Sequence, residues 1–165
     1  MESNNEIRDE VEKWYEKTDP WGYESNPFDA VRKDIILSMI PKGEYLRALD
    51  IGCGEGWITK DLPAKEIYGI ELSDKASERF PENVKRISEP EGKYDLVVAT
   101  GVLYKHYDYQ KFMKWIKEHS SKIIVLCNIE DWEVRTTSLG KPIHDITFNY
   151  REFKQHLKIY DVSTT

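Results

Sequence analysis

A glycine-rich segment in the first third of the chain constrains the fold more than any other feature. An apolar run beginning at Leu46 leads into a stretch in which every second residue is glycine: Gly52, Gly54 and Gly56. A segment compatible with a helix follows from Trp57. This order predicts a strand, a tight turn and a helix. Glycines permit positive φ angles and place no Cβ between a ligand and the backbone, so the turn is suited to a nucleotide-like ligand.

The spacing of these glycines indicates which class of nucleotide-like ligand the turn binds. The dinucleotide fingerprint G-x-G-x-x-G would place its third glycine at position 57, where this chain has Trp57, so an ordinary NAD-binding Rossmann domain is disfavoured. The pattern is Asp50-x-Gly52-x-Gly54-x-Gly56, with the small Cys53 inside the turn. It resembles motif I of the class I S-adenosylmethionine-dependent methyltransferases. A carboxylate at Asp50 suits a ligand with an amino group and a sulfonium better than one with a pyrophosphate.

A second carboxylate supports this resemblance. Glu66 to Leu72 is predicted to form the next strand, and Glu71 lies at its end. An acid at this place can accept both ribose hydroxyls, as the motif II acid of the family does. The alternative is a solvated strand end next to Ser73, a residue that can cap a helix. The joint occurrence of the two motifs favours the ribose role.

The resemblance implies an α/β fold, namely a Rossmann-like three-layer αβα sandwich with a mainly parallel sheet. It also implies S-adenosyl-L-methionine as the cofactor. Many members carry an acid after the third strand that binds adenine, and here Ser88 stands near that place, followed by Glu89. The residues expected to bind the cofactor are Asp50, Gly52, Cys53, Gly54, Gly56, Glu71, Leu72, Ser88, Thr100 and Trp21.

Residues 1–40 are predicted to form N-terminal cap helices. An amphipathic pattern covers Asn5 to Lys17, and Asn26-Pro27 is a typical helix start, followed by an apolar face of Phe28, Val31, Ile35, Ile36 and Met39. Asp19-Pro20-Trp21 and then Arg32-Lys33 resemble the N-terminal part of nodulation protein S-like methyltransferases, which modify amino sugars and related glycosides. Trp21 is expected either to cover the sulfonium through a cation–π contact or to pack the first helix.

The C-terminal half is predicted to complete the core, residues 45–165, within a single domain of residues 1–165. Tyr94 to Thr100 reads as a buried strand, and Ile123 to Asn128 as the next one. Phe148 to His156 is predicted to form a helix, and Leu157 to Val162 a sixth strand. The family normally has a seventh, antiparallel strand, and the sequence leaves no segment for one. We therefore expect either a six-stranded sheet or an oligomer that covers the sheet edge.

Catalytic candidates come from the loops that follow the fourth and fifth strands. These loops carry Tyr104, His106 and His144, which are predicted to act as a base or to bind the acceptor. His106 is the first choice, although a histidine in such a loop is more often a surface or core residue. Nodulation-like members tend to have a glutamate where this chain has Gly101, which removes one acid from the acceptor side.

Composition excludes several functions. The 165 residues carry a net charge of −6, with no cluster of Lys and Arg of the kind that binds nucleic acid. Cys53, Cys127 and the four histidines show no metal-ligand spacing, so no metal is expected. The chain has no run of 18 apolar residues and no signal-peptide pattern, which predicts a cytoplasmic protein without a membrane segment.

The sequence thus predicts methyl transfer from S-adenosylmethionine to N or O of a small molecule, with an amino sugar or glycoside as the acceptor class suggested by the resemblance. The alternative is a catalytically silent S-adenosylmethionine-binding subunit or interaction module, which the missing strand and Gly101 favour slightly.

Overall fold

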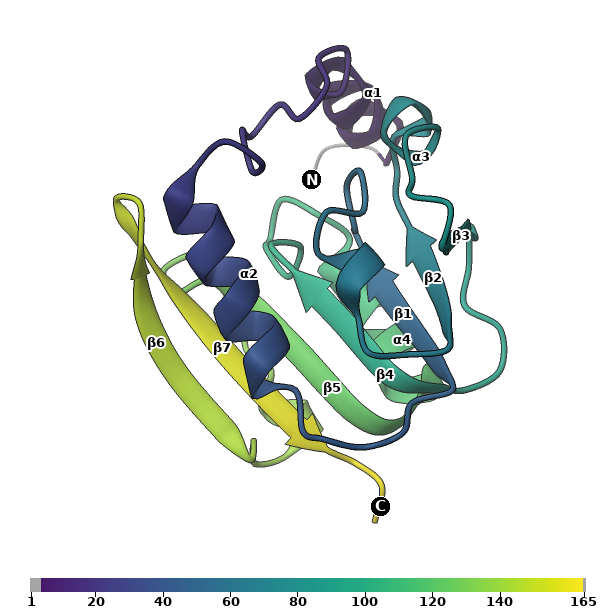
Figure 1. Cartoon of the computed structure of the whole chain (residues 1–165), viewed down its shortest axis with the longest axis vertical. Helices are drawn as coiled ribbons and strands as arrows, with labels where there is room; N and C mark the ends of the chain where they lie inside the picture. Colours follow the sequence, from purple (N-terminus) through teal and green to yellow (C-terminus); the bar gives the residue numbers. More distant parts are fainter. Residues whose placement is uncertain (1–3, 165) are drawn as a thin grey trace.

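The computed structural model describes residues 4–164, which are arranged around one seven-stranded sheet (Figure 1). The strands are β1 (Arg47–Ile51), β2 (Glu66–Ile70), β3 (Val84–Arg86), β4 (Tyr94–Thr100), β5 (Ser120–Ile129), β6 (His144–Tyr150) and β7 (Phe153–Asp161). Their order in the sheet is β3-β2-β1-β4-β5-β7-β6. Pairing is parallel from β3 to β5, whereas β7 runs antiparallel to both β5 and β6. The predicted α/β sandwich with a mainly parallel sheet is confirmed.

Helices cover both faces of the sheet and one of its ends (Figure 1). They are α1 (Asn4–Trp14), α2 (Pro27–Met39), α3 (Asp74–Ser77) and α4 (Tyr109–His119), with short 3₁₀ turns at Thr59–Asp61 and Thr137–Leu139. Ile36 of α2 belongs to the core on one face, and Ile116 of α4 belongs to the core on the other. Helices α1 and α3 pack together beyond the carboxyl ends of the parallel strands. That end of the sheet is therefore enclosed.

Helix α2 begins as predicted but turns a different face to the core. Asn26 caps it by accepting a hydrogen bond from the backbone N–H of Phe28 at 3.0 Å, and Pro27 occupies its first turn. Phe28 and Val31 of the predicted apolar face are exposed. Ile36 is buried as predicted, and Ile35 and Met39 pack partly buried against the core, but Asp29 and Arg32 are buried as well. Two ionisable residues thus take core-facing positions of this helix.

The helix predicted from Trp57 is wrong, because only the 3₁₀ turn Thr59–Asp61 forms there. Pro63 follows closely. A proline lacks the N–H needed to continue a helix and pushes the preceding residue out of the helical region, and Leu62 has an extended ψ of 137°. The glycine turn is followed by a short loop that returns directly to β2.

The prediction that the seventh strand is missing is also wrong. Residues predicted to form a loop, a helix and a sixth strand form the β6–β7 hairpin instead, closed by a two-residue turn at Arg151 and Glu152. Arg151 has a φ of 52°, a left-handed conformation that is uncommon for arginine and therefore could not be predicted from the residue type. Ile146, Phe148 and Tyr150 alternate toward one face, which is the period of a strand. The argument for an oligomer that replaces a missing strand therefore no longer applies.

Within residues 4–164, no helix combines the length and the apolar character needed to cross a membrane.

Candidate functional site

A cavity of about 640 Å³ lies at the carboxyl ends of β1, β2 and β4, beneath α1 and the segment that joins α1 to α2. Its size is within the range of small-molecule sites. Nine of the ten residues predicted to bind the cofactor line it: Trp21, Asp50, Gly52, Cys53, Gly54, Glu71, Leu72, Ser88 and Thr100. Gly56 does not line it, and a Cβ at this glycine would come within 2.8 Å of the Pro81 ring. Residues far apart in the sequence thus meet in one place.

The glycine turn forms the floor of the cavity. Gly52 and Gly54 have φ angles of +72° and +58°, which L side chains rarely adopt. A Cβ at Gly52 would overlap the side chain of Val102, and a Cβ at Gly54 would come within 2.8 Å of the Tyr15 hydroxyl. The absence of side chains at both positions is therefore required by the local packing, and it leaves the backbone open to a ligand.

Asp50, the last residue but one of β1, has a carboxyl group with only one of its oxygens in a hydrogen bond. Its Oδ2 accepts a hydrogen bond of 2.7 Å from the Thr59 hydroxyl, whereas its Oδ1 is buried without a partner. Burial raises the pKa of Asp50 from 3.8 to about 7, with Glu71 adding to the rise and Thr59 and Arg32 opposing it. A buried polar atom without a partner is costly, so this oxygen is poised to receive a donor from a ligand.

Glu71 lies just beyond the carboxyl end of β2 and faces the glycine turn. One carboxylate oxygen accepts a hydrogen bond of 2.8 Å from the backbone N–H of Gly54, and the other accepts one of 3.0 Å from that of Ser73. Burial raises the pKa of Glu71, while these backbone donors act in the opposite direction. The two bonds fix the orientation of the carboxylate and leave further lone pairs on each oxygen.

The N-terminal segment forms the roof of the cavity and is tied to the glycine turn by Arg79. The guanidinium of Arg79 donates to the backbone carbonyl of Tyr15 at 2.7 Å and forms an ion pair with Glu55. Both carboxylate oxygens of Glu55 accept from the backbone N–H of Asp19, at 3.0 and 3.2 Å. These contacts fix the segment that carries Trp21 above the cavity.

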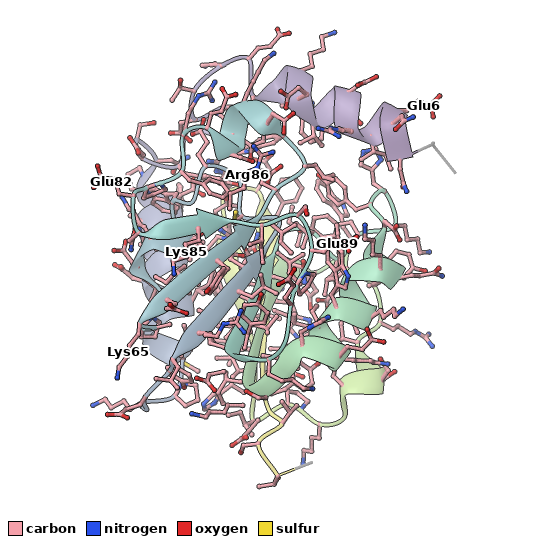
Figure 2. The ribbon with its side chains drawn as sticks, turned by 90° about the vertical axis from the view of Figure 1, so that its right-hand side faces the viewer. Glu6, Lys65, Glu82, Lys85, Arg86 and Glu89 are labelled. Atoms are coloured by element: carbon pink, nitrogen blue, oxygen red, sulfur yellow. The ribbon has the colours of Figure 1, made fainter. Side chains whose placement is uncertain are left out.

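The edge of the cavity near β3 contains Arg86, Ile87 and Ser88. Figure 2 shows Arg86 below the short helix α3, where it forms an ion pair with Asp74, and this pair lowers the pKa of Asp74. Glu89 lies on the loop that follows β3 and does not line the cavity (Figure 2). Of the two side chains considered for adenine contact, only Ser88 lines the cavity.

The three catalytic candidates lie outside the cavity lining. His106 is exposed, and its Nε2 lies 3.0 Å from a carboxylate oxygen of Glu10. The hydroxyl of Tyr104 accepts a hydrogen bond from the backbone N–H of Ile129 at 2.8 Å. His144 is exposed at the start of β6. The structure does not bring these three side chains together.

Several cavity residues were not singled out as site residues from the sequence, namely Tyr15, Arg32, Tyr107 and Trp115. Tyr15 carries the clearest sequence signal, because it belongs to the apolar face of the first predicted helix, a cap helix expected to cover the cofactor. Arg32 precedes the fully buried Ile36 by four residues and shares its inner face of α2, but the apolar residues of this helix pointed to a different face in the sequence.

No group of three or more His, Cys, Asp or Glu side chains suited to a metal ion occurs in the described part of the chain. The two cysteines are free thiols. Burial raises the pKa of both, to about 11 for Cys127, so neither is activated as a nucleophile.

A model of the methyltransferase domain family matches residues 10–164. The chain belongs to this methyltransferase family. The match confirms the resemblance to class I methyltransferases that the glycine turn and Glu71 indicated. No curated protein matches the chain.

Solved structures agree with this methyltransferase fold. N-methyltransferase NodS from Bradyrhizobium japonicum WM9, in complex with S-adenosyl-L-homocysteine, is similar with a TM-score of 0.74 at 18% identity, covering 94% of this chain and 97% of NodS. A second NodS structure gives 0.70 at 17% identity, covering 84% and 98%. DhpI, in the DhpI–SAM–HEP complex, gives 0.62 at 13% identity, covering 98% and 84%. At these identities the likeness concerns the fold.

Proposed function

We propose that this methyltransferase transfers a methyl group from S-adenosyl-L-methionine to a nitrogen or oxygen of a small molecule. The observation that carries the proposal is the pair of carboxylates, Asp50 and Glu71, near the carboxyl ends of adjacent strands, with a turn between them whose Gly52 and Gly54 leave the backbone open to a ligand. NodS, which shares the fold, is an N-methyltransferase with S-adenosyl-L-homocysteine bound in its structure.

The residues present fit this cofactor. Asp50 Oδ1 is buried without a partner, as a site for an ammonium group requires. Glu71 is held by two backbone N–H groups and retains acceptor capacity for the two ribose hydroxyls. Gly52 and Gly54 leave the backbone free of side chains, and Ser88 is placed for the adenine end.

The cofactor supplies an already activated methyl group on a sulfonium when it is bound. The protein therefore has to align two reactants and exclude water, and such alignment is worth an effective molarity of roughly 10⁵ to 10⁸ M. Trp21 and Tyr15 cover the site, and the Trp21 indole N–H lies 3.4 Å from the Tyr15 hydroxyl. We assign the acceptor to the side of the cavity formed by Thr100 and Gly101.

An amine is the acceptor that the cavity suits best. A neutral amine attacks without a strong base, whereas a hydroxyl acceptor requires one. The described residues that line the cavity include no histidine. Burial raises the pKa of the Tyr107 hydroxyl, which lines the cavity. This hydroxyl therefore stays protonated at neutral pH and cannot accept a proton from a hydroxyl acceptor. N-methylation of a small amine, with amino sugars as the first class to screen, follows from this chemistry and from the resemblance to NodS-like enzymes.

Calorimetric titration with S-adenosyl-L-methionine and S-adenosyl-L-homocysteine tests the proposal. We expect micromolar binding to the intact chain and a loss of about 10- to 100-fold in Glu71→Ala, because charge-assisted hydrogen bonds are removed. Glu82→Ala is the control, since Glu82 is exposed and does not line the cavity; Figure 2 shows it at the left edge of the molecule. Intact chain that binds neither ligand would refute the proposal.

A catalytically silent subunit is the competing function. The predicted absence of the seventh strand no longer supports this function, because the sheet has seven strands. Gly101, at the place where a glutamate is expected, still favours it. Binding of S-adenosyl-L-methionine without methyl transfer to any amine, amino sugar or glycoside would decide for it.

A further inference from the structure

The tip of the β6–β7 hairpin contacts the roof of the cavity. Figure 1 shows this tip near the start of α2, and Arg151 is the first residue of its turn. One nitrogen of the Arg151 guanidinium, Nη2, donates to the backbone carbonyl of Trp21 at 2.8 Å and to the Asp29 carboxylate at 2.5 Å. A single nitrogen thus joins the hairpin, α2 and the segment that carries Trp21 over the cavity.

The carboxylate that holds Arg151 is buried and well fixed. Asp29 is fully buried, and its other oxygen accepts a hydrogen bond of 2.5 Å from the Tyr150 hydroxyl. Burial raises the pKa of Tyr150, so this hydroxyl stays protonated at neutral pH and continues to donate. The hydrogen bond with Asp29 raises the pKa of Arg151, which keeps its charge. A carboxylate with these two donors fixes the guanidinium.

The backbone of Arg151 shows that the turn itself does not need an arginine. Its φ of 52° lies in the left-handed region, which is unfavourable for a residue with a Cβ and persists where the surrounding contacts enforce it. Glycine would adopt this conformation without strain. The role of the arginine side chain therefore lies in the contacts of its guanidinium with Asp29 and Trp21.

Residues 19–24 form the part of the roof that Arg151 contacts, and we call them the roof turn. The Asp19 carboxylate accepts from two backbone N–H groups at the other end of the roof turn, at 2.9 and 3.1 Å. The N–H of Asp19 is itself held by Glu55 of the glycine turn. Because the roof turn is bonded to itself, a contact at Trp21 constrains the position of the whole turn.

We propose that Arg151 is a positioning residue that holds the roof turn over the cavity, so that the β6–β7 hairpin determines how tightly S-adenosyl-L-methionine is enclosed. The inference rests on the proposed function, because it concerns the cavity assigned to that cofactor. Arg151 does not line the cavity and acts through Trp21, which does. Enclosure excludes water and commits the bound ligand. Loss of the Arg151 contact therefore weakens binding mainly through faster dissociation.

Asp29→Asn provides the reference protein for the test. Removal of Arg151 from the intact chain would leave a buried carboxylate without its cation, which destabilises the fold for a reason unrelated to the roof. The amide is uncharged, so Arg151 can be replaced in this background without that penalty. Arg151→Gly is the change to add, because glycine accepts the positive φ. It removes the contact with the Trp21 carbonyl and introduces no backbone strain.

Calorimetry and stopped-flow measurements compare Asp29→Asn with Asp29→Asn/Arg151→Gly. The added change should weaken binding of S-adenosyl-L-methionine about 3- to 10-fold, the size of one hydrogen bond from a cation that solvent partly screens, since the Arg151 side chain is 29% exposed. The dissociation rate should rise by a similar factor. Both proteins are titrated at a temperature at which thermal unfolding shows them folded, so a loss of folded protein cannot produce this result.

Hydrogen exchange of the ligand-free proteins gives a readout that does not require the cofactor. Amides of the roof turn should exchange faster once Arg151→Gly is added, whereas those of β4 and β5 should keep their protection. A purely structural role of Arg151 would instead change exchange in the hairpin and leave the roof turn as it is in Asp29→Asn.

Two further variants complete the test. Arg151→Lys in the otherwise intact chain should keep most of the affinity, because both contacts of Arg151 come from one nitrogen and an ammonium offers three donors on one nitrogen. Glu152→Gly in the Asp29→Asn background is the matched control. It removes an exposed side chain from the same turn and adds the same flexibility, and it should change neither binding nor exchange of the roof turn.

Four outcomes overturn the inference. Unchanged affinity with unchanged exchange limits Arg151 to its ion pair with Asp29. Faster exchange of the roof turn with unchanged affinity means that the roof turn does not determine binding. Weaker binding without faster exchange means that Arg151 acts on the ligand directly. An equal loss in Glu152→Gly assigns the effect to flexibility of the hairpin.

Failure of the proposed function has a different signature. An intact chain that binds neither S-adenosyl-L-methionine nor S-adenosyl-L-homocysteine refutes the assignment of the cavity, and the enclosure of the cofactor by Arg151 fails with it. Exchange of the roof turn in the ligand-free proteins still shows in that case whether Arg151 fixes this segment. The two failures are therefore distinguishable.

Discussion

Asp50 and Glu71 illustrate how position decides the chemistry of a carboxyl group. Asp50 lies near the end of β1 and Glu71 directly follows the neighbouring parallel strand β2, and burial raises the pKa of each. Glu71 accepts two backbone hydrogen bonds, whereas Asp50 accepts a hydrogen bond from the Thr59 hydroxyl through one of its oxygens. A carboxylate bonded to backbone N–H groups keeps its charge more readily. Asp50 is therefore the group whose ionisation responds to conditions near neutral pH.

Asp50→Asn should stabilise the ligand-free protein above neutral pH. The folded chain keeps a proton on Asp50 up to a pKa of about 7, whereas the unfolded chain releases it near 3.8. The free energy of unfolding therefore falls as pH rises between these values and stays lower above 7. An uncharged amide avoids this loss, so at pH 8 we expect a gain of about 1 to 3 kcal/mol.

Urea denaturation of the intact chain and Asp50→Asn at pH 5 and pH 8 measures this effect. The stability difference between the two proteins should grow from pH 5 to pH 8, while the variant loses affinity for S-adenosyl-L-methionine. A difference that does not change with pH would show that Asp50 does not carry the buried charge.

The two carboxylates could be predicted from the sequence, but Arg32 could not. Asp50 and Glu71 are recognisable because each follows an apolar strand and the carboxyl ends of adjacent parallel strands meet. Arg32 lies in a helix with Phe28 and Val31, whose hydrophobicity suggested a different inner face. Only the packed structure shows that these two apolar side chains remain exposed while the guanidinium turns inward.

At the scale of elements, local backbone chemistry decided where prediction succeeded. The start of α2 was predicted from its capping residue Asn26, and in the structure Asp108 caps α4 in the same way. The β6–β7 hairpin was missed because its turn, Arg151-Glu152, has none of the Asn-Gly or Asp-Gly signals of two-residue turns. The turn is held by tertiary contacts instead, since Arg151 pairs with the buried Asp29 of α2.

The glycine turn yields a prediction about stability. Gly52→Ala should lower the free energy of unfolding more than Gly140→Ala does, although both glycines have positive φ angles, +72° and +86°. Both variants strain the backbone, but only at Gly52 would the new methyl group overlap a side chain, that of Val102. We expect a difference of about 1 to 3 kcal/mol from this overpacking.

Chemical denaturation of the two glycine variants provides the measurement, and Gly52→Ala combined with Val102→Ala provides a check. Removing the two methyl groups of Val102 should recover part of the loss caused by Gly52→Ala. Equal destabilisation by Gly52→Ala and Gly140→Ala would mean that backbone strain alone makes glycine necessary in the turn.

At the scale of the whole molecule, the site depends on contacts between the N-terminal segment and the sheet. Helix α1 packs on Ala76 of α3, and the segment after it is held by Arg79 and Glu55. The sequence predicted cap helices over the cofactor, but it could not show which residues tie them down. Such long-range pairs depend on the assembled fold, because Arg79 and Tyr15 are 64 positions apart.

Arg79→Ala should loosen the roof of the cavity without unfolding the sheet. The change removes the hydrogen bond to the Tyr15 carbonyl and the ion pair with Glu55. Because the Arg79 side chain is 29% exposed, solvent screens part of the loss, and we expect cofactor affinity to fall about 3- to 10-fold. Lys85→Ala is the matched control, since Lys85 forms its ion pair on the exposed surface of β3, away from the roof (Figure 2).

Hydrogen exchange of the ligand-free proteins locates the effect of Arg79→Ala. Amides of residues 10–20 should exchange faster in Arg79→Ala than in the intact chain, whereas those of β4 and β5 should keep their protection, because a local opening leaves the core strands intact. Calorimetry on the same samples should show weaker binding only in the variant with the faster exchange. Weaker binding with unchanged exchange in residues 10–20 would mean that Arg79 acts on the ligand directly, and faster exchange throughout the sheet would mean that the N-terminal segment stabilises the whole fold.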